Sequence, residues 1–129
     1  MIRGVRGATT VQENDELEIL ENTKELIEEM INRNNIDAES ISHVFISVTN
    51  DLNAAFPAKS LRQIPGFVYV PVMCMKEIDV PGSLARCIRV MMVTNTTIHQ
   101  QNIEHVFHHE AKQLRPDLIR KAGNDTDER

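Results

Sequence analysis

The chain has 129 residues, which is enough for one ordinary domain with a single hydrophobic core. Hydrophobic residues make up 41% of the sequence and charged residues 26%, values close to globular averages that argue against a disordered chain or a membrane protein. No apolar run has the length needed to cross a bilayer, and no signal-peptide pattern follows the first basic residues. We therefore expect a cytoplasmic protein with no membrane partner.

The net charge of −5 is unevenly distributed along the chain. Residues 13–29 hold eight acids and one lysine, so the rest of the chain is slightly basic. Nucleic-acid binders usually cluster Lys and Arg beside aromatic residues, whereas this sequence has no Trp, one Tyr and no basic run. We expect no nucleic-acid partner. The two cysteines, Cys74 and Cys87, lack the close spacing of a zinc or redox pair, which favours free thiols in a reducing compartment.

The first predicted element is a strand over residues 2–9, followed by an amphipathic helix over residues 15–34. In this helix apolar residues recur at three- and four-residue steps, and the acids lie mainly on the remaining face. The acidic run is therefore interpreted as a solvated helix face. Further along, the pattern predicts a short helix over residues 56–64 and strands over residues 42–49, 67–70, 72–78, 87–93 and 103–108.

These elements predict a single α/β (α+β) domain over residues 1–120, with a mixed β-sheet packed by one long amphipathic helix. A polar C-terminal tail is predicted over residues 121–129. Because the strands are apolar on both sides and only one long helix is available, the second face of the sheet needs cover from another copy of the chain. We therefore expect a homo-oligomer.

Arg89 lies inside the apolar strand sequence of residues 87–93, where a charged side chain is costly. Arg6 has a similar setting, between small residues of the first predicted strand. The planar guanidinium group binds carboxylate or phosphate through two hydrogen bonds, so two such arginines suggest a site for a small anion with several acidic groups. The alternative is that each arginine is simply an outward-facing strand residue.

Glu77 is a distinctive carboxylate near Cys74 in an otherwise apolar stretch. Strict strand alternation places these two side chains on opposite faces, so they can share a ligand only if the strand bulges or ends between them. The alternative is a structural ion pair between Glu77 and Lys76 or a neighbouring arginine. Two cations, a carboxylate and a thiol would suit a small molecule that carries carboxylates and a hydroxyl, with no cofactor.

Other common chemistries leave no pattern in this sequence. Four histidines fall close together, but they lack zinc-motif spacing, so we expect no metal. No nucleophile elbow, Cys-His signature or glycine-rich phosphate loop is present. The four histidines are His99, His105, His108 and His109.

Five segments in order closely resemble the small bacterial monofunctional chorismate mutases of the trimeric pseudo-α/β-barrel class. The segments are Arg3–Thr10, Phe56–Lys59, Tyr69–Met75, Cys87–Met92 and Leu114–Leu118. The resemblance covers nearly the whole chain. It implies a homotrimer with an active site at each subunit interface, and the conversion of chorismate to prephenate on the way to phenylalanine and tyrosine. It also implies catalysis by preorganised charge and shape, without covalent or acid–base steps.

The resemblance also implies a role for individual residues. Arg6 would hold a substrate carboxylate, and Arg89 would reach both the side-chain carboxylate and the ether oxygen of the breaking bond. Glu77 and the region of Cys74 would accept and orient the ring hydroxyl. The Tyr that the family uses to bind a substrate carboxylate is Phe107 here, so water, Arg6 or a nearby histidine would have to replace that contact.

The remaining carried-over residues would surround the substrate. Phe56 would line the pocket across the interface, and Met73 is expected among the substrate-binding residues. Lys59 and Arg62 would supply positive field near the mouth of the pocket. The segment with Leu114 and Arg115 would close over it.

The alternative function is a trimeric small-molecule-binding or imine-hydrolysing protein of the reactive-intermediate deaminase type, whose fold is similar. Such a protein would use an arginine for a carboxylate but would not need Glu77 and Arg89 together.

Overall fold

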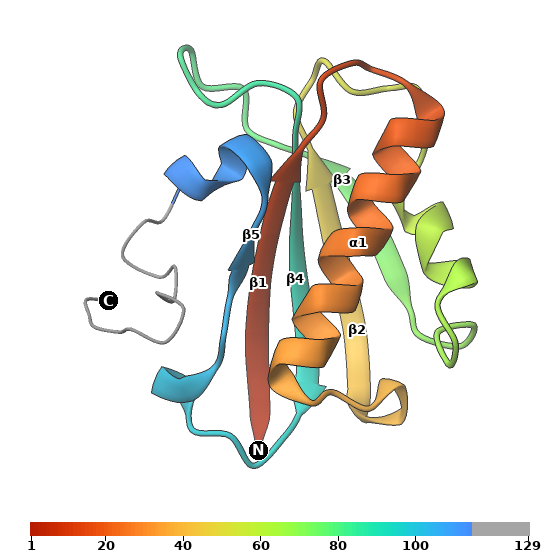
Figure 1. The fold of residues 1–129 in the computed structure, drawn as a ribbon, viewed down its shortest axis with the longest axis vertical. Helices are drawn as coiled ribbons and strands as arrows, with labels where there is room; N and C mark the ends of the chain where they lie inside the picture. The colour runs from red at the N-terminus through yellow and green to blue at the C-terminus, as the bar shows by residue number, and fades with distance from the viewer. Residues whose placement is uncertain (115–129) are drawn as a thin grey trace.

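The computed structural model describes residues 1–114 and contains a five-stranded mixed sheet with one long helix along one face (Figure 1). The strands lie in the order β3-β2-β4-β1-β5. Strand β4 pairs antiparallel with β1 and β2, whereas β3 pairs parallel with β2 and β5 pairs parallel with β1. This confirms the predicted sheet. The strands are β1 (Ile2–Thr10), β2 (Ile41–Val48), β3 (Val72–Lys76), β4 (Cys87–Asn95) and β5 (Val106–Phe107).

Helix α1 (Glu16–Asn34) begins and ends where the sequence supplies caps. The Asp15 carboxylate accepts a hydrogen bond from the backbone N–H of Glu18 at 3.0 Å, which satisfies one of the free donors of the first turn. The Glu18 carboxylate in turn accepts from the backbone N–H groups of residues 12 and 13 at 2.7 and 3.1 Å. Asn35 ends the helix in the left-handed region at φ 51°. The predicted helix is confirmed.

The hydrophobic core lies between α1 and the sheet face that this helix covers. A Cβ at Gly7 would clash with Sδ of Met30 and would lie 3.2 Å from Cδ1 of Leu26, so glycine allows α1 to approach β1 closely. The largest fully buried hydrophobic side chains from α1 and the strands are Ile19, Leu26, Ile27, Met30, Val5, Val44, Ile46, Ile88 and Met92.

The opposite face of the sheet, called here the open face, has no long helix over it in the described part of the chain (Figure 1). Phe45 and Met91 face each other across β2 and β4 on this side and are 40% and 37% exposed. Met73 and Met75 of β3 extend the same apolar surface. Among residues 1–114, a small cluster around Phe107 and Ala111 packs over β1 on this side. The prediction that a second copy covers this face stays a prediction.

Three predicted elements differ from the structure. Residues 67–70 form a turn and not a strand, because Pro71 follows them and the Val70 N–H donates to the Phe67 carbonyl at 3.1 Å. The predicted strand over residues 103–108 shrinks to β5, since Ile103 closes the 3₁₀ helix η3 (Gln100–Asn102). The short helix predicted over residues 56–64 is the 3₁₀ helix η2 (Pro57–Gln63).

Two further findings concern the predicted environment of the chain. Both cysteines are free thiols, as predicted. Among the described residues, no helix combines the length and the apolar character that a membrane span requires. The predicted tail over residues 121–129 lies outside the described residues.

Candidate active site

Strand register places the two predicted arginines on the open face. Arg89 of β4 pairs with Ala8 of β1, and Arg6 of β1 pairs with Met91 of β4. Directly paired residues and residues two apart share a face, so both guanidinium groups arise from the same side of adjacent strands. The backbone N–H of Arg6 donates to Nδ1 of His105 at 2.9 Å, and this contact holds β1 against the segment before β5.

Glu77 follows directly after the end of β3 and contacts Arg89. Glu77 Oε2 lies 3.0 Å from Arg89 Nε, and the two side chains are only 22% and 31% exposed. The Ser47 hydroxyl donates to the same carboxylate oxygen. The ion pair between Glu77 and a neighbouring arginine, which the sequence left open as an alternative, is therefore present. It lies beside Arg6 on the open face, so the pair also forms part of the candidate anion site.

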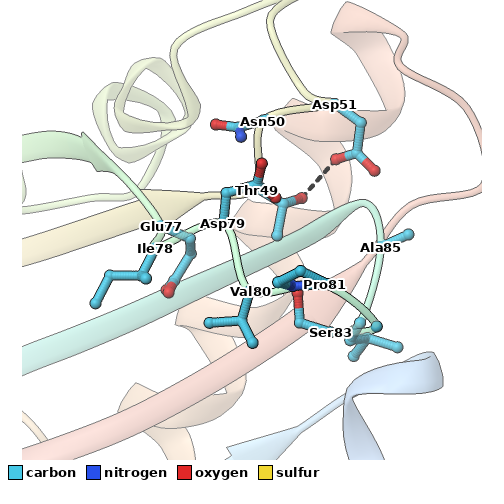
Figure 2. Close-up of a pocket in the computed structure, with 12 residues that line it drawn as sticks. Thr49, Asn50, Asp51, Glu77, Ile78, Asp79, Val80, Pro81, Ser83 and Ala85 are labelled. Atoms are coloured by element: carbon cyan, nitrogen blue, oxygen red, sulfur yellow. Dashed lines mark hydrogen bonds between the residues drawn. The ribbon is translucent and has the colours of Figure 1, made fainter.

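A cavity of about 230 Å³ adjoins Glu77 and is lined by residues 49–51 and 77–85 (Figure 2). Asp51 accepts a hydrogen bond from the Thr49 hydroxyl and two from the backbone N–H of Arg86, at 2.9 and 3.2 Å. These bonds hold Arg86 in the left-handed region at φ 48°. The carboxylates of Asp51, Glu77 and Asp79 make this cavity acidic, so an anionic ligand would instead bind toward the arginines.

A second group of predicted residues lines a separate cleft of about 580 Å³ beside η2 and β3. Cys74 pairs with Ile46 of the core, so its side chain faces α1 and not the open face. The strand ends at Lys76, yet Cys74 and Glu77 are still not brought together within one chain. Lys59 forms an exposed ion pair with Glu16 at 3.1 Å. The predicted residues in this cleft are Phe56, Lys59, Arg62, Met73 and Cys74.

Phe107 of the edge strand β5 lies on the open face beside β1. It pairs with Ala8, is 6% exposed, and has its ring centroid 6.0 Å from Cζ of Arg6. Leu114 packs against the same small apolar cluster from the end of the 3₁₀ helix η4 (His109–Gln113). The structure therefore brings Phe107 and Leu114 to the side of the site that holds Arg6. Arg115 lies outside the described residues.

Burial makes both thiols weaker acids than an exposed cysteine. Burial raises the pKa of Cys87 to about 11, although the positive charge of nearby Arg89 opposes the shift. Burial also raises the pKa of Cys74, against a smaller opposing effect of a hydrogen bond with the backbone of Ala58. Neither thiol supplies a thiolate nucleophile near neutral pH. The protonated thiol of Cys74 can line the cleft and make weak hydrogen bonds to a ligand.

Ser47 is not among the site residues predicted from the sequence. It is visible only as a polar residue inside the apolar run of residues 42–49, and its importance comes from register, since it pairs with Arg89 across β2 and β4. The sequence also does not predict the contact of His108 Nε2 with Glu29 Oε1 at 2.8 Å, which ties the end of β5 to α1. His108 belongs to the histidine group, but a partner in α1 is not visible from spacing.

A mixed sheet with a helix on one face and two arginines beside a carboxylate on the other defines a protein suited to a small molecule with several acidic groups. Comparison with known proteins then identifies the family. Residues 2–118 match the family model for chorismate mutase type I. The chain therefore belongs to the type I chorismate mutase family.

Individual relatives agree with this assignment. Chorismate mutase AroH of Bacillus subtilis (strain 168) is 50% identical over 118 residues, covering 92% of this chain and 93% of the relative. Chorismate mutase AroH of Thermus thermophilus is 45% identical over 119 residues, covering 92% and 97%. The structure of a chorismate mutase from Clostridium thermocellum matches with a TM-score of 0.83 and 45% identity, covering 85% of this chain and 97% of that one. These findings favour a chorismate mutase over the imine-hydrolysing alternative.

Proposed function

We propose that this chain, a chorismate mutase by family, converts chorismate to prephenate on the open face of its sheet. The observation that carries the proposed site is the Arg89–Glu77 pair on the same sheet face as Arg6. Chorismate carries two carboxylates, a ring hydroxyl and the ether oxygen of the breaking bond. The site offers two guanidinium groups for the anionic parts and one carboxylate for the hydroxyl.

The rearrangement is intramolecular, so the protein needs to move no proton and form no covalent bond. One carbon–oxygen bond breaks while one carbon–carbon bond forms, and negative charge develops on the ether oxygen. Arg89 stabilises that charge and binds a carboxylate, while Arg6 holds the substrate in the reactive shape. Even a millionfold acceleration requires only about 8 kcal/mol of transition-state stabilisation.

Glu77 accepts a hydrogen bond from the ring hydroxyl and lies on the side of the ring where positive charge develops. Its ion pair with Arg89 holds both groups ready before substrate binds, which lowers the reorganisation needed during reaction.

The second group of residues completes the site from a neighbouring subunit of a homotrimer. Phe56 is 76% exposed at the cleft beside η2, on the far side of the sheet from β1. In a trimer, this cleft would bring Lys59, Arg62 and Cys74 to the partner's open face, and Leu114 and Arg115 would close the site. The free thiols support a cytoplasmic location.

The test of the activity is the loss of chorismate's ultraviolet absorbance when purified protein is added. We expect prephenate as product, without any added metal or cofactor. Chorismate left unchanged by the folded protein would contradict the proposal.

Subunit mixing tests the shared site. Arg89→Ala alone, and Lys59→Glu with Arg62→Glu in another chain, should each be nearly inactive, because each destroys a different half of the site. Co-expressed and purified as mixed trimers, they should regain activity at about a quarter of the sites, since random assembly pairs two intact halves that often. Separately purified variants mixed without subunit exchange are the control. Mixed trimers no more active than the separate variants, or a single-chain mass in sedimentation, would contradict an inter-subunit site.

A further inference from the structure

Ser47 lies on the open face near the end of β2. In β2 it pairs with Arg89 of β4 on one side and with Met75 of β3 on the other. Its hydroxyl donates to Oε2 of Glu77, which reaches back from the end of β3. A residue of β2 thus contacts a carboxylate that follows the end of β3.

The two oxygens of Glu77 are used unequally. Arg89 Nε lies 3.0 Å from Oε2, the same oxygen that Ser47 contacts. Within residues 1–114, the hydrogen bond from Ser47 and the recorded ion-pair contact from Arg89 both involve Oε2 of Glu77. The carboxylate is therefore anchored through Oε2.

Ser47 supplies the directional part of this arrangement. Arg89 Nε is buried and close to Oε2, yet it makes no hydrogen bond to the described residues, so its N–H is not aligned with the carboxylate. Charge attraction alone sets a distance and leaves the carboxylate free to rotate. An O–H···O⁻ hydrogen bond is both strong and directional, so the Ser47 hydroxyl fixes the rotation of the Glu77 carboxylate.

From this geometry we infer that Ser47 is a positioning residue for the reaction. It holds Oε2 of Glu77 so that Oε1 is presented to the ring hydroxyl of the substrate. The inference rests on the proposed function and concerns the same site. Ser47 acts only through Glu77, which distinguishes it from the residues that bind the substrate themselves.

The first test removes the hydroxyl. Ser47→Ala should lower kcat/KM by about tenfold to a hundredfold, the loss that accompanies a small misplacement of a catalytic group. Ser47→Thr keeps the hydroxyl and should stay within a few-fold of the parent. Ser47→Val has the same shape as the threonine variant without the hydroxyl and should resemble Ser47→Ala. Ser42→Ala, an exposed serine in the same strand whose hydroxyl bonds His43, is the matched control and should leave activity unchanged.

The second test is a double-mutant cycle with Glu77→Gln. Because Ser47 acts through the Glu77 carboxylate, adding Ser47→Ala to Glu77→Gln should cost much less than it costs in the parent. A purely structural serine would instead lower activity by the same factor in both backgrounds and would lower the melting temperature in step with the activity.

The outcomes separate the two proposals. If the parent does not convert chorismate, the proposed function fails, and the inference with it. If the parent is active but Ser47→Ala matches it, or the cycle is additive, the inference alone is overturned. Should Ser47→Ala fail to fold, the comparison of the threonine and valine variants decides, since equal activity of these two overturns the inference.

Discussion

Replacement of Arg89 by citrulline removes the positive charge but keeps the shape and most N–H donors of the side chain. Arg89 Nε is buried beside Glu77, so the charge of Arg89 is held in a fixed position next to the reacting bond. Loss of one preorganised donor to a developing oxyanion lowers kcat by about 10²- to 10³-fold, or about 2.7–4 kcal/mol. We expect a loss of at least this size in kcat and a smaller change in KM, because the ether oxygen gains charge only as its bond breaks.

The same replacement affects the stability of the folded protein far less than it affects kcat. The Arg89–Glu77 pair is partly exposed, so losing its charge should destabilise the fold by only about 1 kcal/mol and lower the melting temperature by about 4 °C. Chorismate absorbance gives kcat and KM, while thermal unfolding and sedimentation report the fold and the assembly. An intact assembly whose kcat stays within a few-fold of the parent would show that Arg89 is structural, and would refute the mechanism.

Three further predictions concern the surroundings of the site. Phe107→Tyr should bind chorismate about fivefold more tightly by calorimetry, because one more hydrogen bond contributes about 1 kcal/mol; unchanged affinity would show that another group makes this contact. Partial burial opposes the charge of Glu29, but the hydrogen bond with His108 and the charge of Arg33 outweigh it and lower its pKa. The carboxylate therefore stabilises the fold above pH 4.5, and this contribution is lost as the pH falls through the lower folded pKa. The melting temperature of the parent should thus fall toward that of Glu29→Gln under acid, and a constant difference between them would contradict the linkage. Gly7→Ala should cost about 1–3 kcal/mol in urea unfolding through its clash with α1, and an unchanged midpoint would show that α1 adjusts freely.

The sequence predicts those structural elements that depend only on residues close together in the chain. The α1 helix follows from its apolar spacing and from the cap at Asp15, and both are visible without any tertiary contact. Arg89 and Glu77 attract attention because a charge is costly inside an apolar stretch, whatever the fold around it. The strand predicted over residues 67–70 failed because a short apolar run can equally form a turn when proline and glycine flank it.

Register decides the rest, and register is a property of paired strands. Alternation alone shows that Cys74 and Glu77 differ in face, but only the pairing with Ile46 shows that Cys74 faces the core. Ser47 becomes a site residue only once it is placed opposite Arg89. The contact of His108 with Glu29 joins residues 79 positions apart, which no local pattern predicts.

The two charged groups of the site are held in different ways, and this explains why one of them needs an additional contact. Arg89 lies in β4, whose backbone is hydrogen-bonded to β1 on one side and β2 on the other, so its Cα is fixed by the sheet. Glu77 follows the last residue of the edge strand β3 and keeps one ladder-like bond, from its N–H to the Val48 carbonyl at 2.8 Å. A carboxylate on such a strand end has more freedom to rotate than a guanidinium in the middle of a sheet. Catalysis by preorganised charge requires both groups to be held in place before the reaction, and the Ser47 hydroxyl supplies at Glu77 the constraint that the sheet supplies at Arg89.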